Sequence, residues 1–335
     1  HLMRRVDINQ VPAGDQNHNG TSDRLEYVHC GADAACQAAL RPFGVFGNNT
    51  INFWRNNGTS KYKSLQTQLN SRFGRGSQFQ VSYTWSDLTA DDPLTDSSGG
   101  IFNGAMTDLN NPGLDRGKAG IHRKHVVNSS LVWHAPSFEN RGRFVSSVLG
   151  DWSLGGVMFY ATGVPLTIYT GGVSGIAGGL AGTGYEGNQR PIRVPGQSCR
   201  AHGGRKEQWL NPNAWTITGY QLGTTGQMAK RGECEGPSFF EVDLSFYKDI
   251  RLGGKLNSQL RIEVFNVTNE TNFINVNTTL SPTDVRYNNV DASHPNGDPT
   301  TATSVLSSKV PLTFGQAQAV RDPRQIQIGF KLFFN

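Results

Sequence analysis

The feature that most constrains the fold of this chain is a strict two-residue alternation of apolar and polar side chains. It is clearest in residues 62–73 and 78–86, which are separated only by the short connection GRGS. Neighbouring side chains of a β-strand point to opposite faces, so this period indicates an antiparallel hairpin with one apolar and one polar face. The apolar set is Leu65, Leu69, Phe73, Phe79, Val81, Tyr83 and Trp85, and the polar set includes Gln66, Gln68, Asn70, Arg72 and Gln80.

The alternation recurs in residues 125–135, 149–160, 241–250, 255–266 and 325–335. With a first strand near Met3 to Ile8, the pattern predicts about eight strands of roughly ten residues each. In 255–266 the residues on one face are Leu256, Leu260, Ile262 and Val264, and those on the other are Asn257, Gln259, Arg261 and Glu263. In the last strand the apolar face carries Ile326, Ile328, Phe330, Leu332 and Phe334.

The connections between these strands alternate in length. Those after Phe73 and Ile250 are short, and the one between Ala135 and Leu149 is moderate. The others are long, and cover about residues 9–60, 89–120, 163–238 and 267–323. A soluble β-sandwich has no reason to alternate in this way, whereas outer-membrane barrels have short periplasmic turns and long extracellular loops. The pattern therefore predicts an all-β fold, a transmembrane antiparallel β-barrel whose C-terminus lies in the periplasm.

This barrel assignment also predicts which side chains meet lipid and which meet the aqueous lumen. Lipid-facing positions should be Leu65, Leu69, Phe79, Val81, Leu131, Leu260, Ile328 and Leu332. Lumen-facing positions should be Gln66, Gln68, Asn70, Arg72, Gln80, Gln259, Arg261 and Glu263, with Arg261 and Glu263 forming an ion pair on one strand face. Tyr83 and Trp85 suit the aromatic girdle at a membrane interface.

Composition agrees with a β-protein, because the chain has 40 glycines and only 17% charged residues among 335. No segment approaches the roughly 18 to 20 consecutive apolar residues of a membrane helix. The chain opens without a start methionine or a signal segment. We therefore expect these eight or so strands to be the last third of a barrel of about 22 strands, with the plug domain and signal peptide outside this chain. A self-sufficient eight-stranded barrel is the alternative; it requires residues 3–8 to pair with 324–334.

Six stretches resemble the Oar-like branch of TonB-dependent receptors. They are YKSLQTQLNSRFGRGSQFQVSYTWS, LGDWSLGGVMFYATGVPLT, QWLNPNAW, GPSFFEVDLSFYKDI, LRIEVFNVTNETNF and TFGQAQAVRDPRQIQIGFKLFF, in the family's order from about residue 60 to the end. The resemblance implies a barrel of the bacterial outer membrane, in contact with lipid and lipopolysaccharide. It also implies energy-coupled uptake, with the TonB complex bound through an N-terminal plug, and often a carboxypeptidase-regulatory-like domain ahead of that plug.

The resemblance extends to the last strand, which is similar to the family's signal for the barrel-assembly machinery. That signal is an alternating apolar strand ending in an aromatic residue. Phe334 would be the aromatic, and the trailing Asn335 departs from the usual ending.

The four cysteines are expected to form two disulfides. An even number in an oxidising compartment suggests the pairs Cys30–Cys36 and Cys199–Cys234, although four cysteines allow three pairings. A zinc site is the alternative, but the spacing of the cysteines does not match that of zinc ligands.

The segment DQNHNGTSDRLE matches the spacing of a calcium-binding loop. Its oxygen-bearing residues fall at positions 1, 3, 5, 7, 9 and 12, with glycine at position 6 for the sharp turn. The candidate ligands are Asp15, Asn17, Asn19, Thr21, Asp23 and Glu26. Two of these are neutral amides and no clear helix flanks the loop, so a turn closed by Asn and Asp side chains is the alternative to a weak Ca²⁺ site.

No motif indicates catalysis, and we expect that the protein is not an enzyme. GTGYEG (residues 182–187) lacks the strand and helix of a nucleotide site, and GGVSGIAGGLAG (171–182) is typical of a flexible loop tip. His122 and His125 suit an interface or lumen better than a metal site, and Asp91 and Asp92 suit a solvated loop.

The net charge of +5 is scattered, with no nucleic-acid motif, so a nucleic-acid partner is not expected. Two functional classes remain open. One is a substrate-specific importer coupled to TonB, and the other is a structural or adhesive surface barrel that binds partners through its long loops.

Overall fold

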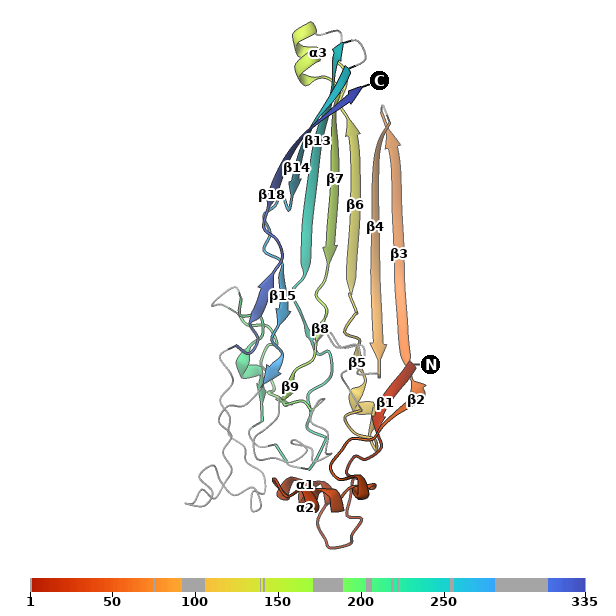
Figure 1. Ribbon diagram of the computed structural model, residues 1–335, viewed down its shortest axis with the longest axis vertical. Helices are drawn as coiled ribbons and strands as arrows, with labels where there is room; N and C mark the ends of the chain where they lie inside the picture. The colour runs from red at the N-terminus through yellow and green to blue at the C-terminus, as the bar shows by residue number, and fades with distance from the viewer. Residues whose placement is uncertain are drawn as a thin grey trace.

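The long alternating segments form one antiparallel sheet (Figure 1). The computed structural model describes residues 2–74, 76–91, 106–138, 140, 142–170, 189–202, 207–217, 220–221, 223–253, 256–280 and 313–334. The sheet order is β18-β14-β13-β7-β6-β4-β3, with the short β5 also paired to β4. The long strands are β3 (Ser60–Phe73), β4 (Ser77–Ala90), β6 (His125–His134), β7 (Trp152–Ala161), β13 (Phe239–Gly253), β14 (Leu256–Phe265) and β18 (Gln325–Phe334).

The remaining elements are short, and all of them except β5 lie outside this sheet. The helices are α1 (Asp23–His29), α2 (Ala34–Ala39) and α3 (Arg143–Leu149), with 3₁₀ turns at Gly44–Phe46, Pro112–Asp115 and Pro212–Ala214. The short strands are β1 (Leu2–Asp7), β2 (Asn52–Gly58), β5 (Gly117–Lys118), β8 (Pro165–Leu166), β9 (Tyr169–Thr170), β10 (Ile192–Arg193), β11 (Trp215–Thr216), β12 (Cys234–Glu235), β15 (Phe273–Val276), β16 (Thr279–Leu280) and β17 (Ala317–Val320). Within the described residues no helix is both long and apolar enough to span a bilayer.

The register of the strands divides the sheet into an apolar face and a polar face. Residues paired directly across antiparallel strands point to the same face. One row joins Leu131, Gly156, Leu244, Val264 and Ile326 across five strands. The apolar face consists of the odd-numbered residues of β3, β4 and β6 and the even-numbered residues of β7, β13, β14 and β18. Its side chains include Leu65, Leu69, Phe79, Val81, Leu131, Leu154, Met158, Leu244, Phe246, Leu260, Ile262, Ile328 and Leu332.

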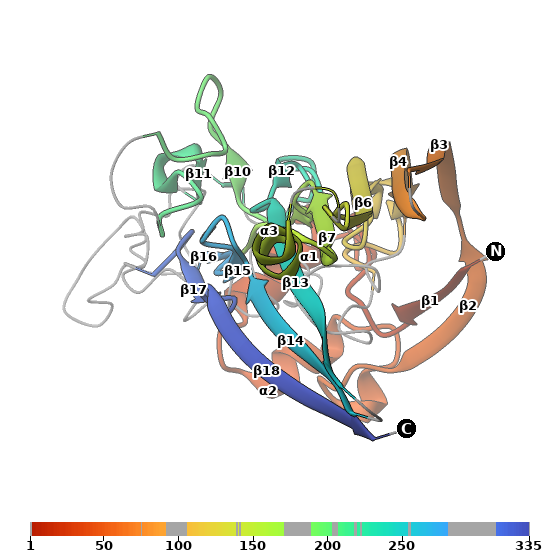
Figure 2. The same ribbon diagram turned by 90° about the horizontal axis from the view of Figure 1, so that it is seen from above.

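The sheet is open, and no closed barrel is formed by the described strands. Its edges are β3 and β18, which do not pair with each other. From above, the strands follow one another in a curved row (Figure 2). The expected first strand near Met3 to Ile8 exists as β1, but its place was predicted wrongly. It pairs with β2 outside the main sheet, so seven long strands build the sheet.

The sequence pattern predicted that the long connections are loops. In the structure they pack together at one end of the sheet (Figure 1). We call their described parts the cap: residues 8–51, 106–124, 162–170, 189–238, 266–280 and 313–324. The cap has a hydrophobic core of its own, which includes Val28, Leu166, Ile168, Leu210, Ala214, Trp215, Ile217, Tyr220, Leu280 and Phe314. Residues from three separate connections therefore share one core. The short turns and α3 lie at the opposite end.

Both expected cysteine pairs occur as disulfides of the cap. Cys30 and Cys36 have Cα atoms 5.6 Å apart, and Cys199 and Cys234 have Cα atoms 5.9 Å apart. Every cysteine of the chain is therefore paired. The second disulfide ties residue 199 to β12, next to the hydrophobic core.

Replacing Cys30 and Cys36 together by serine is expected to lower the stability of the N-terminal part of the cap by about 2 kcal/mol. The reason is that the pair closes a loop of only a few residues, so it removes little entropy from the unfolded chain. Hydrogen exchange of α1 and α2, followed by mass spectrometry, measures this effect. Unchanged exchange in these two helices would contradict the expectation.

Candidate functional site: a pocket between the sheet and the cap

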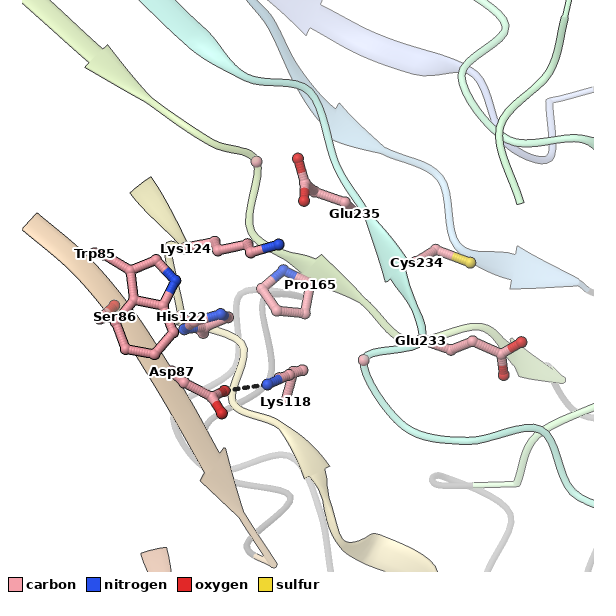
Figure 3. A pocket seen from close by; sticks show the side chains of 12 residues that line it. Trp85, Ser86, Asp87, Lys118, His122, Lys124, Pro165, Glu233, Cys234 and Glu235 are labelled. Carbon is pink, nitrogen blue, oxygen red and sulfur yellow. Dashed lines mark hydrogen bonds and ion pairs between the residues drawn. The ribbon is translucent and has the colours of Figure 1, made fainter. Parts of the chain in front are cut away.

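A pocket of about 310 Å³ lies where β4 enters the cap (Figure 3). One wall is the end of β4, and the others come from β5 and the segments around residues 122–124, 163–165 and 232–235. The lining residues are Trp85, Ser86, Asp87, Lys118, His122, Lys124, Gly163, Pro165, Gly232, Glu233, Cys234 and Glu235. Four parts of the chain that are distant in sequence thus meet at one site.

Two glycines allow these segments to approach one another. A Cβ atom on Gly163 would lie 1.8 Å from the carbonyl oxygen of Gly236, so only glycine permits this backbone contact. Gly232 has a φ of +59°, which favours glycine, and its Cβ would lie 2.6 Å from the carbonyl oxygen of Lys118. The pocket therefore depends on glycine at both positions.

The charged groups of the pocket are partly paired. Lys118 and Asp87 form an ion pair inside it. Glu233 pairs with Arg193 at 2.6 Å, and Figure 3 shows its side chain directed away from the other labelled residues. Lys124 and Glu235 contribute one ammonium and one carboxylate in addition. The pocket thus presents charges of both signs beside the indole of Trp85.

His122 is a buried residue of the pocket lining, and the pKa of its imidazole lies below its ordinary value. Burial is the main cause, and the charges of Lys118 and Lys124 lower this pKa further, whereas the Asp87 carboxylate opposes them. The backbone N–H of Leu88 donates a hydrogen bond to Nδ1 at 3.3 Å, so the proton of the neutral ring is on Nε2. The ring can therefore donate to a ligand oxygen without adding charge to the pocket.

A second pocket of about 450 Å³ lies nearby, between Arg123 and the segment 273–279. Burial lowers the pKa of the Arg123 guanidinium, and the charge of Arg321 lowers the pKa further. Arg123 Nη1 donates to the carbonyl of Thr162 at 2.6 Å. This arrangement adds a positively charged wall to the same region of the molecule.

Buried ion pairs hold parts of the cap together. Arg24 and Asp108 are almost fully buried and interact at 2.6 Å, and Thr225 donates to Asp108 at 3.2 Å. Burial raises the pKa of Asp108, but the hydrogen bond and charge of Arg24 outweigh it and leave this pKa below its ordinary value. Arg190 and Asp115 form a second buried pair at 3.4 Å. Each pair joins two different long connections.

The residues predicted for the two sheet faces fall as the alternation requires. Gln66, Gln68, Asn70, Arg72 and Gln80 share one face, and so do Gln259, Arg261 and Glu263. On this polar face Arg261 and Glu263 interact at 3.4 Å, and Gln259 donates to Asp249 at 2.8 Å. Ile326, Ile328, Phe330, Leu332 and Phe334 lie on the apolar face, opposite Val264, Ile262, Leu260, Ser258 and Leu256.

The expected calcium loop is closed by its own hydrogen bonds. The backbone N–H groups of Asn19 and Gly20 donate to the Asp15 carboxylate, and the side-chain amides of Asn17 and Asn19 donate to Glu26. Asp23 instead accepts from the backbone N–H of Gln16 and begins α1, a helix that the sequence did not indicate. Thr21 donates its backbone N–H to Asn19.

No three His, Cys, Asp or Glu side chains among the described residues are grouped to hold a metal. The geometry is that of the Asn- and Asp-bonded turn, and calcium binding remains a prediction.

The remaining motif candidates divide between described and undescribed parts. His125 accepts or donates a hydrogen bond with the hydroxyl of Tyr83 at 2.9 Å. Residues 171–182, GTGYEG (182–187) and Asp92 lie outside the described residues.

The sequence reasoning missed the pocket. Lys118 and Glu235 carry no local signal, since neither belongs to a recognisable sequence motif. The glycines at 163 and 232 are the only hint of a close approach, and 40 glycines in the chain obscure it.

A family model described as an outer membrane beta barrel domain matches residues 1–327. No curated protein and no solved structure matches the chain.

Proposed function

The chain belongs to the family of outer membrane β-barrel domains and therefore to the bacterial outer membrane, and from this premise we propose that it is a wall section of a TonB-dependent receptor of the Oar-like branch. In this proposal the apolar face meets lipid and the polar face meets the lumen. The cap lies outside the cell, and the receptor imports a ligand that the cap first binds.

The observation that carries the barrel part of this proposal is the open sheet with two unlike faces. Backbone groups at a sheet edge cannot stay unpaired in lipid, so the edges at β3 and β18 require further strands. Seven long strands are about a third of a barrel of about 22. The edges are thus completed by strands that this sheet does not contain, and a sheet without them should associate through β3 and β18.

Uptake through TonB is supported by the resemblance of the strands from about residue 60 onward to those receptors. The plug that contacts the TonB complex would occupy the space beside the polar face. The last strand, ending at Phe334, would be read by the barrel-assembly machinery.

The pockets between sheet and cap support ligand binding on the outer side. Trp85, Lys124 and Glu235 suit a polar ligand with a flat face and charged or hydroxyl groups. No catalytic role is assigned to them, and we propose that the protein is not an enzyme.

Deleting the gene is expected to abolish uptake of at least one nutrient, and a protonophore should abolish the same uptake in cells that keep the gene. The probes are a radiolabelled ferric siderophore, cobalamin, an oligosaccharide and an oligopeptide, each supplied at limiting concentration. The dependence on the proton gradient follows from energy coupling through TonB. Uptake of all four at the same rate with and without the gene would contradict the proposal.

Within that assay, Trp85→Ala should weaken apparent affinity for the imported probe by about tenfold, because truncating an aromatic contact at a ligand costs more than about 1 kcal/mol. Trp133→Ala is the matched control. Trp133 is exposed on the apolar face towards the other end of β6, and its loss should leave uptake unchanged.

A surface-adhesion barrel is the second candidate, and the folded cap favours it. Two disulfides, buried ion pairs and a hydrophobic core make the cap a stable platform for a partner. Loss of attachment on gene deletion, without any loss of uptake, would select this function instead.

A further inference from the structure

The helix α3 lies at the end of the sheet opposite the cap (Figure 1). It forms within the connection between β6 and β7. The hydroxyl of Ser146 donates to the carbonyl of Ser137 at 2.9 Å, which folds the helix back on the end of β6. The backbone N–H of Gly150 closes the helix by donating to Ser146.

Two side chains of the sheet hold the C-terminal end of α3. Lys248 Nζ donates to the carbonyls of Gly150 at 2.7 Å and Val148 at 3.2 Å. Trp152 Nε1 donates to the same carbonyl of Val148 at 2.9 Å. The carbonyls at a helix C-terminus carry partial negative charge, so they are suitable partners for an ammonium group.

Both of these side chains belong to the apolar face. Lys248 and Trp152 are directly paired across β13 and β7, and each is two residues from an apolar-face residue, Phe246 or Leu154. The Lys248 ammonium lies 5.4 Å from the centre of the Trp152 ring. Lys248 is also 9% exposed. Among the described residues, Lys248 is the one cation at this end of the apolar face, and its hydrogen bonds go to carbonyls at the C-terminal end of α3. The helix α3 must therefore lie on the apolar side of the sheet.

The helix nevertheless leaves its own apolar side chains uncovered. Phe144 is 79% exposed, Leu149 56% and Val148 47%. Phe144 and Val148 are four residues apart, so they lie on the same side of the helix. Phe138, just before the helix, is 38% exposed as well. These side chains extend the apolar surface of the sheet beyond the ends of the strands.

We propose that α3 is an interfacial helix that inserts Phe144, Val148 and Leu149 into the periplasmic leaflet of the outer membrane. The apolar face of an outer-membrane barrel meets lipid, and α3 continues that face. The end with short turns is the periplasmic end. The occupant of this surface is thus phospholipid at the boundary between head groups and acyl chains, where amphipathic helices bind. The helix fixes the depth of β6, β7 and β13 in the bilayer.

The test is a depth measurement on the full-length protein. Because every cysteine is in a disulfide, Phe144→Cys introduces one reactive thiol for a nitroxide label. The labelled protein is reconstituted in vesicles of phosphatidylethanolamine and phosphatidylglycerol. Collisions with oxygen, which concentrates in lipid, are compared with collisions with a water-soluble nickel chelate. Ile328→Cys on the apolar face is the lipid control, and Val45→Cys, 89% exposed in the cap, is the aqueous control.

The label at 144 should show an oxygen-to-nickel collision ratio severalfold above that at 45 and close to that at 328. In a Lys248→Met background the ratio at 144 should fall towards the value at 45, since the helix loses its anchor. An aqueous ratio at 144 in the otherwise unchanged protein overturns the proposal. A label shielded from both reagents also overturns it, because a protein partner or a second copy would then cover the helix.

Discussion

Substituting Asp115 with alanine is expected to destabilise the cap by about 3–5 kcal/mol, the cost of removing one member of a buried ion pair. Asp115 is fully buried. Its carboxylate accepts from Arg190 at 3.4 Å and from the backbone N–H of Thr107 at 2.9 Å. Without it, the guanidinium of Arg190 stays in the interior without its counter-charge. The loss of this counter-charge lowers the free energy of unfolding by more than the loss of the hydrogen bonds alone.

Denaturant-dependent hydrogen exchange of peptides covering 106–118 and 189–195 measures this loss. Asp87→Ala is the matched control, because Asp87 pairs with Lys118 but the two side chains are 38% and 40% exposed. Such surface pairs contribute about 0–1 kcal/mol. Equal losses in the two variants would mean that burial does not strengthen the Arg190 pair.

Substituting Leu131 with arginine should cost about 2–4 kcal/mol, the penalty for a cation on the lipid face near the middle of the bilayer. Leu131 is on the apolar face in the interior of the sheet, with Phe79 and Gly156 as its cross-strand neighbours. No carboxylate is opposite it in the register. The arginine would have to reach an interface or draw water into the bilayer.

Urea titration of folding into lipid vesicles, followed by tryptophan fluorescence, measures the cost. Ser130→Arg is the matched control, one residue away on the polar face and opposite Gln80. It should change stability by less than about 1 kcal/mol, as lumen positions tolerate charge. A Ser130→Arg variant as unstable as Leu131→Arg would contradict the assignment of the faces.

The strands could be predicted from sequence because each residue's face depends only on its parity. In β4, Phe79, Val81 and Tyr83 alternate with polar residues, and the register keeps them on one face. The placement of β1 could not be predicted in this way. Its pairing with β2 depends on where residues 52–58 lie, and parity says nothing about which strands are neighbours.

The cap was not predictable because its decisive contacts are charged and remote in sequence. Arg24 and Asp108 are 84 residues apart, and charged side chains of this kind are usually on the surface. Short cysteine spacing did suggest the Cys30–Cys36 pair. The helix α3 has only seven residues, which is too few for helical periodicity to be recognised.

The shared core of the cap also sets the order in which the protein can be completed. A hairpin of the sheet, such as β3–β4, joins two strands that are consecutive in the sequence, so it can form as soon as its second strand is available. The cap core instead needs Phe314, which packs edge-on against Trp215, and Gln208 donates to the carbonyl of Phe314 across 106 residues of sequence. Contacts between such remote segments form late. During biogenesis the cap must therefore wait until residue 314 has been exported, and a chain interrupted before that residue would have hairpins but an unfinished cap.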